Sequence, residues 1–117
     1  MQAVAALLNK EWATSGVRVH YVPDYYSGDS FDAWLKRQGE TPRDIGTHAG
    51  IADTSQLMAV APNLIRTDKL APGGEPKVTG VSGNPRRASI AYGRKGLEMK
   101  IEAAVAQIRK LIAARGK

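Results

Sequence analysis

The chain has 117 residues, a net charge of +6 and no cysteine. Its length fits one domain spanning residues 1–117, and its apolar fraction of 43% is that of an ordinary globular protein. No apolar run is long enough for a transmembrane helix, and the apolar N-terminus lacks the basic residues of a signal peptide. Without cysteine there is neither a disulfide framework nor a thiolate metal site, so we expect a cytoplasmic domain without membrane contact.

The positive charge is concentrated in the last third of the chain, and two interpretations remain open. A basic surface attracts nucleic acid or another anionic partner. It is equally typical of a solvated helix face with a charged tail. Tyr92 is the only aromatic residue there on which a base could stack, so a nucleic-acid partner is the less favoured interpretation.

The first two predicted elements are a helix from Gln2 to Thr14 and a strand from Val17 to Val22. The helix has apolar residues near helical spacing, and the strand alternates with β-branched and aromatic residues. Gly16 separates the two elements. A helix followed at once by a strand is half of an α/β crossover unit, whose first strand would have to precede Met1.

Three helical segments are predicted in the middle of the chain. They are a helix from Ser30 to Gly39, a helical turn that starts at Thr41-Pro42, and a helix from 51 to 61. Ser30 and Thr41 are N-cap residues by type, and Pro42 suits the first position of a helix.

A long C-terminal helix is predicted after an irregular stretch, residues 67–83, that has at most a short strand at Val78–Val81. Asn84-Pro85 is a cap-and-proline start signal, and the helix is expected to reach Ala114. Its apolar stripe recurs at steps of four, four, three and four residues: Leu97, Ile101, Val105, Ile108 and Ile112.

His48 is the candidate functional residue, with Asp53 five residues later at the start of the 51–61 helix. Imidazole moves protons near neutral pH, and a carboxylate is favoured at a helix N-terminus. Gly50 between them allows a tight turn or a close approach of ligand to the backbone. An acid–base pair and a purely local capping arrangement both fit this pattern.

Two further features have weaker functional interpretations. Arg86-Arg87 at the start of a helix would suit a bound anion, or would simply be a solvated first turn. His20 lies in the predicted strand and is expected to be structural or exposed. Two histidines 28 residues apart, without cysteine, match none of the standard metal-binding spacings.

Three segments in order resemble the creatininase family of metal-dependent amidohydrolases. Each is weak alone, but their order and spacing are family-like over essentially the whole chain. They are His48-Ala49-Gly50-x-x-Asp53-Thr54-Ser55, then Pro62-Asn63-Leu64-Ile65-Arg66, then Gly80-Val81-Ser82-Gly83-Asn84-Pro85-Arg86-Arg87-Ala88-Ser89 with Gly93-Arg94-Lys95.

The resemblance implies hydrolysis of a non-peptide or cyclic amide C–N bond, with a small-molecule amide as substrate. It implies an α/β fold, a partial three-layer arrangement that is helix-rich with few strands and a long C-terminal helix. His48 takes the place of the family's proton-shuttling histidine. Asp53 takes the place of its accompanying carboxylate, which is usually Glu and therefore one methylene longer.

The family's metal ligands, an E-x-H pair, a following Asp and an N-G-H/G-x-N loop, have no counterpart in this sequence. Without such ligands no divalent metal such as zinc or manganese would generate a bound hydroxide. We therefore expect a C-terminal half of the fold that has no metal site and no activity by itself. It would associate with itself or with a complementary N-terminal half; the alternative is a non-catalytic oligomerising module.

Overall fold

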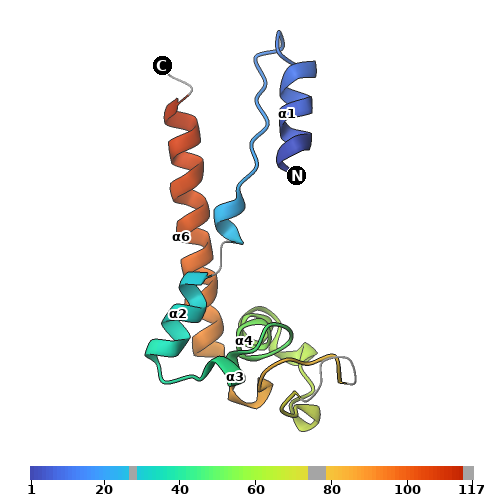
Figure 1. Ribbon diagram of the computed structural model, residues 1–117, viewed down its shortest axis with the longest axis vertical. Coiled ribbons are helices and arrows are strands. Elements are labelled where there is room, and N and C mark those ends of the chain that lie inside the picture. The colour runs from blue at the N-terminus through green and yellow to red at the C-terminus, as the bar shows by residue number, and fades with distance from the viewer. Residues whose placement is uncertain (27–28, 74–78, 115–117) are drawn as a thin grey trace.

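A single long helix, α6, runs through most of the length of the molecule and organises the rest (Figure 1). The computed structural model describes residues 1–26, 29–73 and 79–114, with Asp29 described by its backbone alone. The elements in chain order are α1 (Gln2–Glu11), η1 (Pro23–Tyr25), α2 (Asp29–Arg37), α3 (Pro42–Ile45), α4 (Ile51–Val60), η2 (Pro62–Leu64), η3 (Thr67–Lys69), η4 (Pro85–Arg87) and α6 (Ile90–Ala114).

The described residues divide into a packed body and a loosely packed arm. The body comprises α2, α3, α4, η4 and the first half of α6, and the arm comprises α1, residues 12–22 and α6 from residue 101 onward. The whole measures 55 × 28 × 27 Å with a radius of gyration of 18.1 Å. Compact domains of about 100 residues have a radius of about 13 Å, so the arm makes this molecule long.

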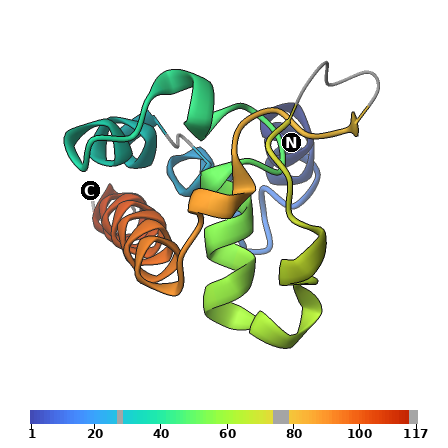
Figure 2. The same cartoon turned by 90° about the horizontal axis from the view of Figure 1, so that it is seen from below.

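The body owes its packing to the contact between α4 and α6, which lie side by side in Figure 2. Gly93 makes this possible, because a Cβ there would stand 1.8 Å from the carbonyl oxygen of Ser55. Gly96, one turn later, lies against the ring of Phe31 in the same way. The core cluster beside these glycines consists of Phe31, Leu35, Ile45 and Ile51.

The predicted long C-terminal helix is confirmed, but it begins at Ile90 and not at Asn84-Pro85. Asn84-Pro85 opens the short 3₁₀ turn η4, and the chain is extended at Ala88. Ser89 then caps α6, since its Oγ accepts the amide of Tyr92 at 3.1 Å. The Ser89 amide itself donates to the buried Oγ of Ser55 at 3.1 Å, which fixes the helix start against α4.

The shorter predicted helices are also present, with shifted ends. α1 ends at Glu11 where Thr14 was expected, and α2 begins at Asp29, one residue before the expected cap. Thr41 does cap α3, because its Oγ1 accepts the amide of Asp44.

The predicted strands are not formed. Residues 17–22 are extended but pair with no other strand in the part of the chain that the structure describes. Val78 of the predicted strand Val78–Val81 lies outside the described residues, and Thr79 to Val81 form no strand. The helix-rich character is thus confirmed, whereas the strands fail because extended backbone becomes a sheet only when a neighbour supplies the hydrogen bonds.

The extended segment 17–22 is held from the side by α1. The Asn9 side chain both donates to the carbonyl of Val19 and accepts its amide, each at 2.8 Å. Gln107 of α6 accepts the amide of Asp24 at 3.0 Å just beyond. No helix in the described part is both long and apolar enough to cross a bilayer.

Candidate functional site

The loop between α3 and α4 carries His48, and a second segment of chain fixes its shape. Ser82 donates its amide to the His48 carbonyl at 2.8 Å, and its Oγ accepts the amide of Thr47 at 3.2 Å. Gly46 permits this approach: its φ is 66°, and a Cβ would lie 1.7 Å from the Ser82 carbonyl oxygen. The family-like segment around Ser82 therefore clamps the loop around His48.

Asp53 has a clear structural task at the start of α4. Its Oδ2 accepts the amide of Ala49 at 2.9 Å, and Ala49 has the left-handed φ of 51°. Thr54 completes the turn by donating its Oγ1 to the Ala49 carbonyl at 3.1 Å. The carboxylate therefore holds the residue next to His48, as the capping interpretation expected.

His48 and Asp53 line one pocket of about 330 Å³, so the structure brings the two predicted residues to the same cavity. Both side chains are exposed, and no hydrogen bond joins them among the described residues. The full lining is Tyr26, Phe31, Asp32, Ile45, Gly46, Thr47, His48, Gly50, Ala52, Asp53, Gln56 and Lys100.

Lys100 is a pocket residue that the sequence did not single out. It comes from α6, 52 positions after His48, and its half-buried side chain places Nζ 5.6 Å from the centre of the Tyr25 ring. Such a cation–π contact steadies an ammonium group. A signal was available, because Gly93, Gly96 and Lys100 recur at i, i+3 and i+7 on one face of the helix.

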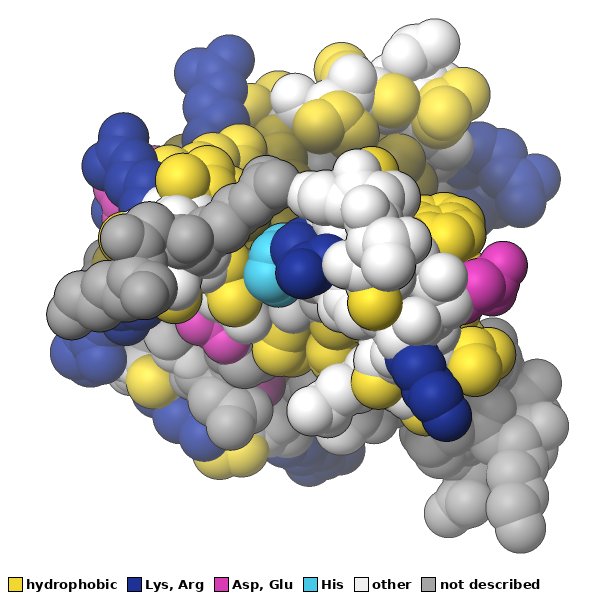
Figure 3. All heavy atoms as spheres, turned by 90° about the horizontal axis from the view of Figure 1, so that it is seen from above, with side chains coloured by type: hydrophobic (Ala, Val, Ile, Leu, Met, Phe, Trp, Pro, Cys, Tyr) yellow, Lys and Arg dark blue, Asp and Glu magenta, His cyan; other side chains and the backbone are white. Residues whose placement is uncertain are grey.

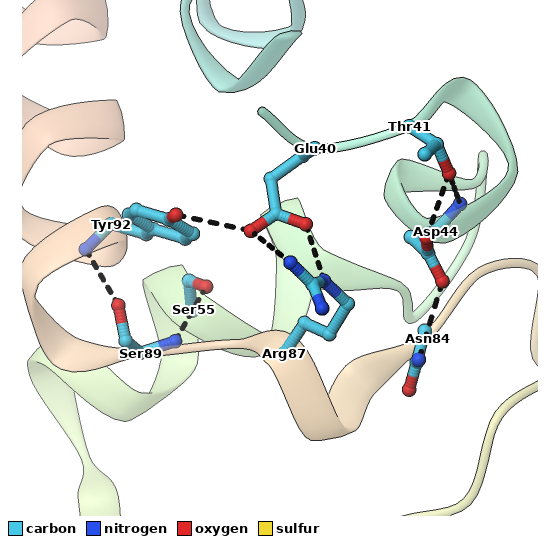
Figure 4. Close-up of polar contacts among 8 residues, drawn as sticks. All are labelled: Glu40, Thr41, Asp44, Ser55, Asn84, Arg87, Ser89 and Tyr92. Carbon is cyan, nitrogen blue, oxygen red and sulfur yellow. Dashed lines mark hydrogen bonds and ion pairs between the residues drawn. The ribbon is translucent and has the colours of Figure 1, made fainter. Parts of the chain in front are cut away.

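A polar cluster forms around the buried carboxylate of Glu40, with Arg87 and Tyr92 as its partners (Figure 4). The Glu40 carboxylate, 6% exposed, accepts Nη2 of Arg87 at 3.1 Å and the hydroxyl of Tyr92 at 3.0 Å. The hydrogen bond from Arg87 to Glu40 raises the pKa of that guanidinium. Burial, together with the bond to Glu40, raises the pKa of the Tyr92 hydroxyl. The cluster ties α2's end, η4 and α6 together.

Asp44 forms a second polar contact on the same side (Figure 4). It accepts the hydroxyl of Thr41 at 2.7 Å and the amide Nδ2 of Asn84 at 3.2 Å. These two hydrogen bonds, in that order, lower the pKa of the Asp44 carboxyl, and the charge of Arg87 adds to the effect. In addition, the backbone N–H of Asn84 donates to the backbone carbonyl of Asp44 at 2.7 Å, so side chain and backbone both join the two segments.

The arginine pair considered as an anion site is engaged within the chain. Arg87 binds Glu40, and Nε of Arg86 donates to the Leu70 carbonyl at 2.7 Å. The pair also lies within the 3₁₀ turn η4 and not at the start of the long helix. These guanidiniums therefore serve the internal packing of the 80–90 segment.

His20 lies away from this pocket, in the arm. It is exposed, and with Arg18, Leu111 and Ala114 it lines a hollow of about 190 Å³ against α6. No group of three or more His, Cys, Asp or Glu side chains able to hold a metal ion occurs among the described residues.

The comparisons with known proteins agree with the motifs. A family model described as Creatininase, creatinine amidohydrolase, matches residues 1–108 of the chain. The chain therefore belongs to the creatininase family. No curated protein and no solved structure gave a significant match.

Proposed function

We propose that this chain supplies the proton-transfer side of a metal-dependent amidohydrolase acting on a non-peptide or cyclic amide. The observation that carries the proposal is the placement of His48 and Asp53 on one pocket in a member of the creatininase family. The pocket, at about 330 Å³, has the size of a small-molecule site.

In this proposal His48 takes a proton from the attacking water and returns it to the leaving nitrogen as the C–N bond breaks. An imidazole suits both steps because it gains and loses a proton near neutral pH. Asp53 is its carboxylate partner. Oδ2 is engaged by the Ala49 amide, while Oδ1 makes no hydrogen bond among the described residues and is open to the imidazole.

The residues present do not fit a resident divalent metal. His48 and Asp53 would need at least one further imidazole or carboxylate converging on the same point, and the described residues gather no such group. We therefore propose that zinc or manganese would be held by ligands outside this chain's described residues, and that the chain alone is inactive.

A complementary half would also explain why the 17–22 segment of the arm has no strand beside it in the described part of the chain. Residues 17–22 are extended and lack strand neighbours in the described part, which supports a place in a three-layer α/β fold once further segments pack on them. Those segments would belong to a complementary N-terminal half, carried by the same or another polypeptide.

The first test is metal content and turnover of the chain alone. After loading with zinc or manganese and removing the excess, elemental analysis should find well under one ion per chain, and creatinine should not be hydrolysed. Near-stoichiometric metal would contradict the proposal that the metal ligands lie outside the described residues of this chain.

The second test restores the missing ligands by co-expression with the N-terminal portion of an active family member. His48→Ala should then lower turnover by about a hundredfold or more, because general acid–base catalysis contributes about 10²–10⁴. His20→Ala is the matched control. It removes the second histidine of the chain, which lies in the arm away from the pocket, and should leave turnover unchanged. Equal turnover in both variants would remove His48 from the reaction.

A non-catalytic oligomerising module is the second candidate function. It is favoured by the large apolar side chains exposed on the arm, among them Val4 at 50%, Leu7 at 63% and Ile112 at 67%. Contiguous exposed apolar surface is typical of an interaction site. Association without turnover in the complemented protein would favour this candidate over the hydrolase.

A further inference from the structure

The C-terminal half of α6 carries an apolar stripe that nothing in the described part of the chain covers. Its members are exposed by 55%, 38%, 41% and 67%, respectively: Ile101, Val105, Ile108 and Ile112. Figure 3, which looks down on this end of the molecule, shows hydrophobic side chains at the surface among Lys and Arg. Four large aliphatic residues in line on one exposed helix face indicate a protein contact.

The N-terminal segments that pack beside α6 contact a different face of this helix. Gln107 binds the backbone at Asp24 and Tyr21, and Leu111 and Ala114 line the hollow beside Arg18 and His20. At about 100° per residue these contacts are centred well over 100° around the helix from Val105. The stripe therefore faces away from the chain's own extended segment.

The spacing of the stripe is that of a helix that pairs with another helix. Steps of four, three and four residues are the d-a-d-a positions of a heptad repeat, which form a seam between two supercoiled helices. In that register Glu102 and Arg109 both occupy e positions, at the edge of the seam. Both are exposed, and neither makes an ion pair among the described residues.

We propose that the stripe binds the same stripe of a second copy of this chain, with the two α6 helices antiparallel. In that arrangement Ile101 faces Ile112 of the second copy, and Val105 faces Ile108 of the second copy, so all four layers are apolar. Pairing α6 with its own copy is isologous and closes as a dimer.

Charge complementarity selects the antiparallel direction. Glu102 then lies within about one helical turn of Arg109 of the second copy, and the symmetry of the dimer forms this contact twice. In a parallel pair each e position lies beside a g position of the other helix, here Leu97 and Ala104, so neither Glu102 nor Arg109 would meet an opposite charge.

Charge reversal, read by sedimentation equilibrium of the full chain, tests the proposal. The wild-type chain is expected to dimerise, and Glu102→Lys or Arg109→Glu should each weaken the dimer about tenfold, because attraction becomes repulsion at two symmetric sites. The double variant, with both charges exchanged, should return to within about threefold of wild type.

Lys110→Glu is the matched control, because it makes the same charge change one residue further on. Lys110 lies about 140° around the helix from Val105, against about 40° for Arg109, so this variant should dimerise like wild type. A monomeric wild-type chain, a dimer indifferent to the single reversals, or a double variant that does not recover would each overturn the proposal. Circular dichroism of these exposed-site variants verifies that each is folded.

The direction of pairing can be measured with a spin label on one introduced cysteine, because the chain has no cysteine of its own. A spin label attached to Ala91→Cys, at the exposed start of α6, should give a distance of about 45 Å along the axis in the antiparallel dimer. A distance of about 20 Å or less would show parallel pairing and overturn the proposal.

Discussion

The body and the arm of this molecule are built from similar helices but are packed very differently. In the body, α4 and α6 approach until backbone touches backbone at Gly93, and Leu35 and Ile51 are completely buried. In the arm, Ala5 is the one buried apolar residue among those described, and Leu7 and Ile112 are largely exposed. The candidate site lies in the body, and the unpartnered apolar surface lies in the arm.

This difference separates what the chain stabilises by itself from what it leaves for a partner. Burial of apolar side chains is the main favourable term in folding, and the body contains nearly all of it. The pocket around His48 therefore rests on a rigid support. The arm has apolar side chains at the spacing of a packed helix, but these side chains are exposed. Its segments are held together by side-chain hydrogen bonds such as those of Asn9.

The largest expected effect comes from removing a core side chain of the body. Leu35→Ala should lower the free energy of unfolding by about 3 kcal/mol, through lost burial and the cavity left behind. Leu7→Ala, at a residue 63% exposed in the arm, should change it by less than about 0.5 kcal/mol. Urea unfolding of both variants measures the comparison, and equal losses would mean that the arm is packed as well as the body.

A second substitution probes the helix contact itself. Gly93→Ala should destabilise the chain by about 2 kcal/mol, although alanine is the better helix former, because its Cβ would lie 1.8 Å from the Ser55 carbonyl oxygen. Ala106→Gly, in the exposed half of the same helix, should cost only the propensity difference of about 1 kcal/mol. Thermal unfolding distinguishes the two, and a stabilising Gly93→Ala would contradict the close approach.

The pH dependence of stability should also originate in the body. The pKa of Asp44 is lowered in the folded state, so its contribution is present above the ordinary aspartate pKa of about 3.9 and is lost as the pH falls through the folded value. Asp44→Asn should flatten the fall in stability on the acid side. Denaturation midpoints between pH 5 and pH 2 provide the measurement, and an unchanged slope would show that Asp44 is not linked to folding.

The smallest effect is expected in the arm. Asn9→Ala removes both hydrogen bonds to Val19, so the Val19 amide should exchange with solvent much faster, while global stability changes by no more than about 1 kcal/mol. Hydrogen exchange followed by NMR reports both regions at once. The Ser89 amide, bonded to Ser55 in the body, is the internal control and should keep its protection.

Prediction from the sequence succeeded where the signal was local. The Thr41 cap, the helix from residue 51 and the stripe of α6 follow from neighbours within a few positions along the chain. His48 and Asp53 were found because their spacing matches a family motif, and the structure places both on one pocket. Whether they transfer protons stays a prediction.

The errors arose where a distant segment decides the outcome. Asn84-Pro85 has the chemistry of a helix start, but the bonds from Asn84 to Asp44 hold it in a separate turn, and Ser89 caps α6 instead. The spacing from Gly93 and Gly96 places Lys100 on the packing face of α6, but only the fold shows that this face borders the pocket of His48. The 17–22 segment was predicted as a strand, which needs a partner that local pattern cannot supply.

By itself, the sequence determined the helices, the family and the residues on which the proposed chemistry depends, because hydrophobic spacing, capping types and motif spacing are all local properties. Only the tertiary structure decided that His48 and Asp53 share a pocket with Lys100, that Arg87 binds Glu40, and that the α6 stripe remains exposed. These outcomes depend on which surfaces meet, and such contacts between segments 30 to 80 residues apart are not encoded in any short stretch of chain.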